Sequence, residues 1–480
     1  MEDSKQESSL AKTAFWLIAA KILSFGITFA IPLILARRLS VYNYGIYKQA
    51  FLLVATISSH GQFGFPMSSY YFFPRHKNHA AVVMNVFALK PSLAVQLTGS
   101  PEMERLAGLL GWTILFVMVS YFFELITVLN QEAKLASRIM VLSATSKGVL
   151  WIFAANVWGS VESLLWMYLL QGIGQTAFLL YYLNSRFPGF LREFDGELFR
   201  QQVVYCTRFL VSGLLIAAMN DLHSYVVGRR FGAEQFAIYA VGCLQIPLTS
   251  ILTEAIGPLL IRQVNRLESE GKTGEIAQLL SEAARKLAMV FFPLAGCLMV
   301  VGREFLTILF TGRYAESYPV FCFNLLLIPL GIFLFDPVSR AFPQYQGTTL
   351  QIRVGLVLLL IGFLYVFLHW FGPVGAMMAG VATAIVERVL MMYFWMNVLE
   401  WPKLDRRVLR DIGLLLGSAI AAGLVALQGR TMIGSANPWT ILVTCSMIYG
   451  GVYLGIAALT GIATHEERQW LSAKLGGVRV

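Results

Sequence analysis

"LILARRLSVYNYGIYKQAF", residues 33–51, ends a long apolar run with an arginine pair, and a similar phrase returns at "YVVGRRFGAEQFAIYAVGC", residues 225–243. The matches stand at one shift of 229 − 37 = 192 residues: Arg37-Arg38 on Arg229-Arg230, Tyr44 on Phe236, Ile46-Tyr47 on Ile238-Tyr239 and Pro66 on Pro258. A weaker match joins "ALKPSLAVQLTG" (88–99) to "VGREFLTILFTG" (301–312). The chain therefore contains an internal repeat.

The composition indicates a membrane protein. Of the 480 residues, 57% are hydrophobic and only 13% are charged, whereas a soluble domain would carry about 25% charged residues. The formal net charge of +10 does not indicate a nucleic-acid partner, because the basic residues stand between apolar runs rather than on one polar face. We therefore expect a multi-pass membrane protein that binds no nucleic acid.

A membrane-spanning helix needs about 20 mostly apolar residues. Thirteen stretches meet this requirement: 13–36, 45–65, 106–129, 139–159, 163–183, 203–227, 236–261, 286–309, 317–336, 354–371, 375–399, 411–428 and 438–460. The stretch 79–97 is ambiguous. If it crosses, alternate connections carry roughly twenty basic residues and the others roughly seven, which agrees with the positive-inside rule. This count predicts about fourteen helices with both termini in the cytoplasm.

Repeats separated by six spans have the same orientation in the membrane. The predicted fold is therefore all-α, with two parallel six-helix lobes related by a pseudo-two-fold axis, followed by two additional helices. We expect an N-terminal lobe at 1–185, a cytoplasmic linker at 186–202, a C-terminal lobe at 203–400, and two further helices with a cytoplasmic tail at 401–480.

The arginine pairs are predicted to anchor the first helix of each lobe at the external headgroups, with direct ligand contact as the alternative. The tyrosines that follow them are expected in the interfacial belt. The polar segment 265–288 has apolar positions at helical spacing, which predicts a linker helix on the cytoplasmic surface. The five cysteines and six histidines show no ligand-like spacing, so neither a disulfide, a metal site nor a cofactor is expected.

Three segments together resemble one transporter family: "LARRLSVYNYGIYKQAFLL", "GFPMSSYYFFPR", and the echo "GRRFGAEQFAIYAV" after the linker "REFDGELFRQQ". They are similar to the lipid-linked oligosaccharide flippases, the polysaccharide-exporter branch of the multidrug/oligosaccharidyl-lipid/polysaccharide superfamily. One departure concerns the third helix: placing Lys90 on Arg303 leaves only about 11 apolar residues before it, or about 16 Å of helix.

The resemblance implies a flippase rather than an enzyme. Such a protein would move a polyprenyl-pyrophosphate-linked oligosaccharide from the cytoplasmic to the outer leaflet by alternating access, through a cationic cavity between the lobes. The product would feed lipopolysaccharide or exopolysaccharide synthesis at the bacterial cytoplasmic (inner) membrane. The implied partners are the lipid-linked glycan, membrane lipids, and a polymerase and glycosyltransferases of the same pathway.

Charged residues inside predicted spans are costly and therefore candidates for function. A desolvated Lys or Arg can neutralise a pyrophosphate, so Lys21, Lys48 and Arg208 are the predicted head-group residues. An ion pair with Glu124 is the structural alternative for Lys21. Lys147, deep in the predicted span 139–159, is a further candidate.

The acidic residues suggest other roles. Glu254 and Asp221 are candidates for coupling transport to a proton or sodium gradient. Asp336 and Arg340, spaced i, i+4, are expected to pair on one helix face, either structurally or as a latch for one conformational state. Glu387 and Arg388 are adjacent and are therefore expected to have separate partners.

Two other functions remain open. A cation-coupled multidrug antiporter of the same superfamily would need an acidic site, for which Glu254 or Asp221 would serve. A membrane-embedded polyprenyl-glycan transferase or ligase would need a sizeable external loop or a tight cluster of acid–base groups. The sequence shows neither of these features, so we expect no catalytic residues.

Overall fold

The structure is a computed structural model that describes residues 2–60, 101–399, 406–434 and 437–460. These ranges are helical with short connections and contain no strand. The chain divides into two compact units, Met1–Ala240 and Val241–Val480. The ambiguous span 79–97 lies outside the described residues, and the lobe boundary at 186–202 stays a prediction.

Unit 1 is built from long helices joined by short turns. Its helices are α1 (Glu2–Arg38), α2 (Val41–His60), α5 (Pro101–Leu129), α6 (Ala133–Val157), α7 (Val161–Arg186), the 3-10 turn η2 (Phe190–Arg192) and most of α8 (Gly196–Gly242). Helix α1 packs along α6, and α5 packs along α7. The Ser160 hydroxyl accepts a hydrogen bond from the Ser163 amide at 3.2 Å, which caps an otherwise unpaired N–H at the start of α7.

The internal repeat corresponds to two equivalent helix ends. Helix α1 ends at Arg38, and α8 breaks at Gly232, whose φ of 77° lies in the left-handed region that glycine adopts without a steric penalty. Both arginine pairs are exposed at these ends. A long apolar helix closed by exposed arginines is thus present at both copies of the repeated phrase.

Most tyrosines of the repeat are buried, and for these the expectation of an interfacial position was wrong, whereas Tyr42 is 38% exposed. Tyr44 and Tyr239 are 0% exposed and Tyr47 is 4% exposed. The Tyr47 ring packs edge-on against Trp151 at 5.8 Å, and the Tyr239 hydroxyl hydrogen-bonds His223 at 2.7 Å. These side chains therefore pack inside the protein, where rings meet other rings and the Tyr239 hydroxyl has a polar partner, rather than in the headgroup region.

Unit 2 contains the remaining helices. They are α9 (Pro247–Ser269), α10 (Thr273–Phe310), η3 (Gly312–Ser317), α11 (Tyr318–Leu325), α12 (Leu327–Leu330), α13 (Asp336–Ala341), η4 (Pro343–Tyr345), α14 (Gln346–Val398), α15 (Arg406–Ile433) and α16 (Pro438–Leu459). Helix α14 is two arms that meet at Gly372, whose φ is 57° and which precedes Pro373. This bend divides α14 at the boundary predicted between the spans 354–371 and 375–399.

The segment 265–288 is not a separate surface helix, which corrects the sequence expectation. Its first residues complete α9, and the rest is continuous with α10 to Phe310. The Lys272 ammonium, at 2.7 Å, lowers the pKa of the Glu270 carboxyl below its usual value in the turn between them. Ile276 and Leu280 pack in a buried cluster with Val338 of α13. The apolar positions thus face other helices and extend the bundle instead of lying on a membrane surface.

The predicted span 317–336 is not one continuous helix. Helix α11 ends at Leu325 and α12 at Leu330, residues 331–335 are not helical, and α13 starts at Asp336 followed by Pro337. Pro329 and Pro337 each lack an amide hydrogen for the helical ladder. Such breaks at membrane depth occur where protein covers the freed backbone groups, and Ile332 and Phe335 are indeed buried.

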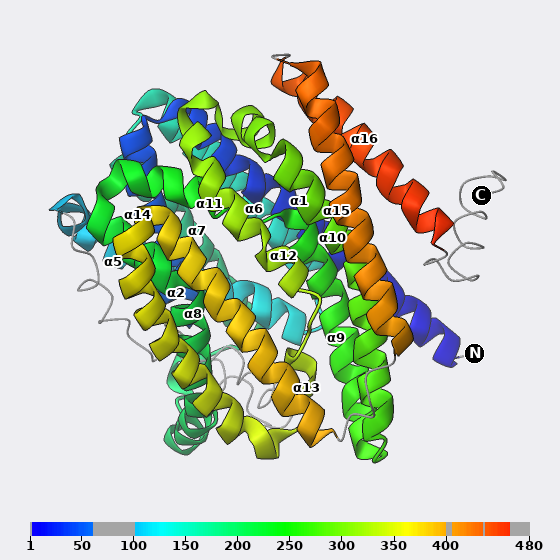
Figure 1. Cartoon of the computed structure of the whole chain (residues 1–480). Coiled ribbons are helices and arrows are strands. Elements are labelled where there is room, and N and C mark those ends of the chain that lie inside the picture. Colours follow the sequence, from blue (N-terminus) through cyan, green and yellow to red (C-terminus); the bar gives the residue numbers. More distant parts are fainter. Residues whose placement is uncertain (1, 61–100, 400–405, 435–436, 461–480) are drawn as a thin grey trace. The chain divides into compact units, whose positions relative to one another are not determined.

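Helices α15 and α16 pack on α10 (Figure 1). A buried cluster that includes Phe291, Val300, Ala422 and Tyr449 joins the three helices. Tyr449 donates a hydrogen bond to the Ala419 carbonyl at 3.1 Å, and its ring end lies against Gly296. The two helices predicted to follow the repeat are therefore an integral part of unit 2.

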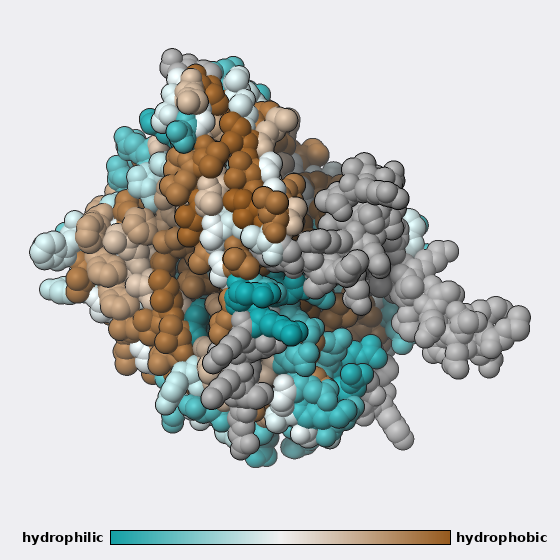
Figure 2. All heavy atoms as spheres, turned by 45° about the vertical axis from the view of Figure 1, so that its right-hand side comes forward, coloured by the Kyte–Doolittle hydropathy of each residue, from teal (hydrophilic) through white to brown (hydrophobic). Residues whose placement is uncertain are grey.

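The described helices fit a multi-pass membrane protein. Eight of them are long and apolar enough to cross a bilayer, or nine if the pair Val211–Gly242 and Pro247–Ser269, bent by 58°, is one span. Within the described ranges, most of each of the thirteen clear stretches is helical; residues 61–65 of the second stretch lie outside these ranges, and the stretch 317–336 is interrupted at 331–335. Hydrophobic residues cover much of the helical surface in the view of Figure 2, and hydrophilic residues gather toward its lower end.

Candidate functional site

Helix α2 carries the predicted head-group residue Lys48 on an aromatic surface. The Lys48 ammonium lies 5.6 Å from the ring centre of Tyr44 and 6.0 Å from that of Tyr47. Rings at this distance attract a cation through their negative faces. The tyrosines of the repeat therefore help to hold a positive charge inside unit 1.

Lys21 is exposed on α1, and its charge attracts the Glu124 carboxylate of α5. This interaction was the structural alternative weighed from the sequence. An exposed cation at a helix face can bind a ligand and a nearby carboxylate in turn. The structure thus leaves both readings of Lys21 open, and the head-group role stays a prediction.

A set of polar contacts joins α2 to α8 within unit 1. The Thr56 hydroxyl donates to Asp221 Oδ2 at 2.9 Å, and the Gln49 side-chain amide donates to the Gly228 carbonyl at 3.1 Å. A Cβ on Gly45 would overlap the Ala233 carbonyl. Helix α2 can therefore approach α8 this closely only because Gly45 has no side chain.

The other predicted site residues are dispersed. Arg208 lies on α8, in the stretch 207–210, for which the structure describes the helical backbone but not the side chains. Glu254 is exposed on α9 of unit 2. Asp336 and Arg340 form the expected pair, with Arg340 Nε 2.8 Å from Asp336 Oδ2 and both side chains more than half exposed. The pairing is a structural fact, whereas the latch role stays a prediction.

Glu387 and Arg388 contact each other, contrary to the expectation of separate partners. Arg388 Nη1 lies 3.8 Å from Glu387 Oε2. The side chains of adjacent residues leave a helix in different directions, but the long arginine stem can curve back. In an apolar layer, this long contact is better than leaving each charge alone.

The surroundings of Lys147 are the main feature that sequence reasoning missed. Its ammonium, on α6, lies 4.4 Å from the ring centre of Trp151 and 4.6 Å from that of Tyr168 on α7. Phe51 of α2 is a third ring at 5.9 Å. We call Lys147, Trp151, Tyr168 and Phe51 the aromatic box. The i, i+4 spacing of Lys147 and Trp151 was visible in the sequence, but their partners on α2 and α7 were not.

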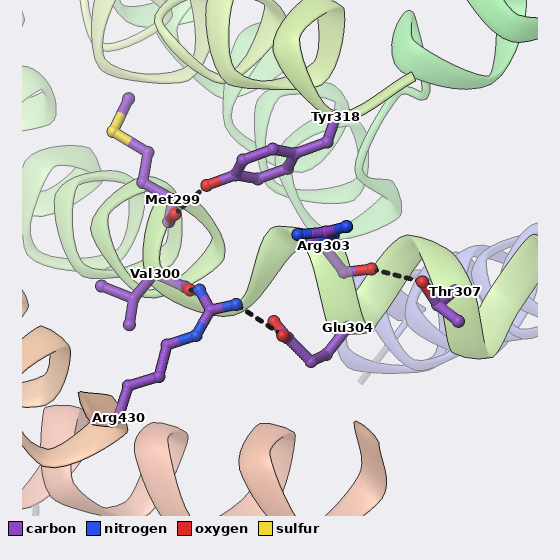
Figure 3. Close-up of polar contacts among 7 residues, drawn as sticks. All are labelled: Met299, Val300, Arg303, Glu304, Thr307, Tyr318 and Arg430. Atoms are coloured by element: carbon purple, nitrogen blue, oxygen red, sulfur yellow. Dashed lines mark hydrogen bonds and ion pairs between the residues drawn. The ribbon is translucent and has the colours of Figure 1, made fainter. Parts of the chain in front are cut away.

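A second missed pair lies in unit 2. Arg430 of α15 donates to the Val300 carbonyl at 2.7 Å and to Glu304 Oε1 at 2.6 Å (Figure 3). Glu304 is 7% exposed. Tyr318, drawn in the same view, donates to the Met299 carbonyl at 3.0 Å. These contacts hold α15 and α11 to α10 and have no obvious ligand-binding role.

The comparisons with known proteins identify the family. The profile of a family described as "Polysaccharide biosynthesis protein" matches residues 78–319, which is half of the chain. The chain belongs to this family. The resemblance drawn from the repeated phrase is thereby confirmed at the level of the family. No curated protein sequence matches this polysaccharide biosynthesis protein significantly.

Solved structures show which fold this family member has. An inward closed conformation of the lipid II flippase MurJ superposes with a TM-score of 0.62 at 13% identity, covering 92% of this chain and 98% of that one. An inward-facing multidrug resistance MATE transporter of the MOP superfamily gives 0.58 at 13% identity, covering 80% and 94%. At such low identity these matches establish the fold alone.

A third match bears on polarity. A MOP superfamily transporter from Pyrococcus furiosus, described as having a binding pocket of reverse polarity, gives a TM-score of 0.56 at 13% identity, covering 82% of this chain and 95% of that one. The predicted fold class, an all-α membrane protein with the two-lobe transporter fold, is confirmed. The fold is thus shared by proteins described with different substrates, so substrate must be argued from this chain's own residues.

Proposed function

We propose that this protein flips a polyprenyl-pyrophosphate-linked oligosaccharide from the cytoplasmic to the outer leaflet by alternating access, for cell-surface polysaccharide synthesis. Family membership supports a role in polysaccharide biosynthesis, and the fold supports transport. Both termini would then be cytoplasmic and the protein would reside in the bacterial inner membrane. The polymerase and glycosyltransferases of the pathway would be its functional partners.

The observation that carries the proposal is the run of cations inside unit 1. Lys21 and Lys48 stand on two different apolar helices, α1 and α2. Cations on apolar helices create a positive electrostatic potential in a low-dielectric layer, and this potential favours an anionic substrate. A pyrophosphate supplies negative charge and accepts several hydrogen bonds.

The α2–α8 contact supplies the element that would open and close. In the predicted topology the α2–α8 contact lies toward the external side, because α1 and the part of α8 before Gly232 end there at their arginine pairs. The contact rests on Thr56 with Asp221, Gln49 with Gly228, and the close approach at Gly45. Release to the outer leaflet would require these contacts to separate, and each is weak enough to break within a transport cycle.

The test is translocation of a fluorescent polyprenyl-pyrophosphate oligosaccharide in proteoliposomes, read by quenching from outside. Lys21→Ala should lower the rate at least about tenfold, since a hydrogen bond to a charged group contributes about 1.5–3 kcal/mol. Lys21→Arg should retain most of it. Lys134→Ala is the matched control, because Lys134 is an exposed lysine at the start of α6.

Glu124→Gln separates the two readings of Lys21. If Lys21 serves only as the partner of Glu124, both substitutions should cause the same loss. If Lys21 binds the head group, Glu124→Gln should leave transport intact or raise it, because it removes a competing anion. Gradient-driven efflux of a cationic dye without glycan translocation would instead identify a multidrug antiporter. Product formation from a polyprenyl donor by the purified protein alone would identify a transferase.

A further inference from the structure

The aromatic box around Lys147 contains more hydrogen-bond donors than acceptors. Among the described residues, none forms a hydrogen bond or ion pair with Lys147, whose neighbours are ring faces. Trp151 is 2% exposed, and its buried indole N–H has no partner in the described part of the chain. Lys147 and Trp151 lie one turn apart on α6, so an ammonium and an indole N–H without acceptors share one helix face.

An unmatched acceptor lies beside the box on α7. Gln171, one turn beyond Tyr168, donates to the Ser143 carbonyl at 2.8 Å and to the Ser146 hydroxyl at 3.0 Å. These two bonds fix the amide, and its Oε1 is buried without a partner among the described residues. Ser146 directly precedes Lys147, so the acceptor borders the same α6–α7 seam.

The box has an open side. Lys147 and Phe51 are partly exposed, and Tyr121 of α5, whose hydroxyl is hydrogen-bonded to Tyr168, is 55% exposed. Tyr168 itself is buried at 7%. Helices α2, α5, α6 and α7 thus present a set of packed rings with one accessible edge.

We propose that the aromatic box binds an acidic sugar of the transported glycan, one that carries its charge as a carboxylate on the ring. The carboxylate accepts from Lys147 and from the Trp151 N–H, which supplies both missing acceptors. A hydroxyl of the same sugar donates to Gln171 Oε1. The apolar face of the sugar ring lies on the exposed aromatic edge. The assignment rests on the proposed function and extends it to the sugar chemistry that the protein selects.

A purely structural role for Lys147 makes a different prediction. If the ammonium only bridges the rings, replacing it would loosen α6 against α2 and α7 and impair binding of every substrate alike. Under the proposal the loss depends on the sugar. The discriminating quantity is therefore the ratio of affinities for two glycans that differ only in one carboxylate.

The experiment uses the full chain in lipid nanodiscs and two probes, polyprenyl-pyrophosphate disaccharides that end in glucuronate or in glucose. Lys147→Met should raise the Kd for the glucuronate probe about tenfold or more, and change that for the glucose probe less than about twofold. Lys147→Arg should retain most of the preference. Trp151→Phe, which keeps a ring and removes the N–H, should shift the ratio in the same direction by a smaller factor.

Lys134→Met is the control and should leave both dissociation constants unchanged. Equal losses for both probes, or no loss for either, would overturn the acidic-sugar assignment while leaving the flippase proposal in place. An equal loss for polyprenyl pyrophosphate without sugar would also overturn it and would place the pyrophosphate at the box. Wild-type protein that binds neither glycan probe would overturn the proposed function itself.

Discussion

Arg430 and Glu304 are separated by 126 residues and meet at 2.6 Å, where the arginine of α15 holds a carboxylate of α10 that is almost fully buried. The second guanidinium nitrogen donates to the Val300 carbonyl one turn earlier. One side chain thereby fastens α15 to α10 through two hydrogen bonds.

Arg430→Met should destabilise the protein by about 3 kcal/mol, since it leaves a buried carboxylate without its counter-charge. Thermal unfolding in detergent measures this. Because well-packed apolar residues can replace a buried ion pair with little loss, the double variant Glu304→Met/Arg430→Met should recover much of the stability. A double variant no more stable than Arg430→Met alone would show that the pair does not act as a unit.

Gly296→Ala should lower the unfolding temperature because a Cβ there meets the Tyr449 hydroxyl in a buried contact between α10 and α16. Overpacking of this kind typically costs about 1–3 kcal/mol. Tyr449→Phe removes the overlapping oxygen, so the double variant should be more stable than the sum of the single losses predicts. Strict additivity of the two changes would contradict the contact.

Gly45→Ala should separate α2 from α8, because the new methyl group would overlap the Ala233 carbonyl. We expect a cysteine introduced at Gln49 to become more reactive toward a water-soluble maleimide. Gly111→Ala on α5 is the matched control, since its Cβ would meet no atom within 4 Å. Equal reactivity in both backgrounds would argue against a close α2–α8 contact.

Asp221→Asn tests the predicted ion coupling. The substitution keeps an oxygen that accepts from Thr56 but removes the negative charge. If Asp221 binds the coupling cation, stimulation of transport by a proton or sodium gradient should be lost while glycan binding remains. Thr56→Val removes the hydrogen bond and keeps the charge, so it should preserve the gradient effect. Full stimulation in Asp221→Asn would exclude the role.

Arg340→Gln separates a structural pair from a latch. An exposed i, i+4 pair contributes less than about 0.5 kcal/mol, so the unfolding temperature should hardly change. A change in transport rate without a change in stability would support the latch. If neither quantity changes, the pair between Asp336 and Arg340 is incidental to transport.

The spans were predictable because a run of apolar residues long enough to cross a bilayer has few alternatives. The matching ends of α1 and of the part of α8 before Gly232 were also foreseeable, since the arginine pairs repeat in the sequence. The continuous helix through 273–310 was not foreseen, because an amphipathic stretch packs equally well on a lipid surface or on neighbouring helices.

The site was harder to predict than the fold. The cost of Lys147 in an apolar helix was evident from the sequence, but its ring partners come from positions 51 and 168, which only tertiary packing brings together. The partner of Glu304 was equally hidden, because pairing over 126 residues leaves no local spacing pattern. Burial of Tyr44 and Tyr239 shows the same limit: amphipathic rings suit a membrane interface and a protein interior alike.

Because α15 and α16 are attached to α10, a label on α16 can report on the movement of α10. With Arg430 on Glu304, Tyr453 on the Met289 carbonyl and Tyr449 on the Ala419 carbonyl, the final helices form one block with α10. A dye attached at the solvent-exposed end of α16 would follow the movement of α10 rather than fluctuate on its own. Single-molecule fluorescence from that position would therefore record the working cycle without altering any residue proposed to bind substrate.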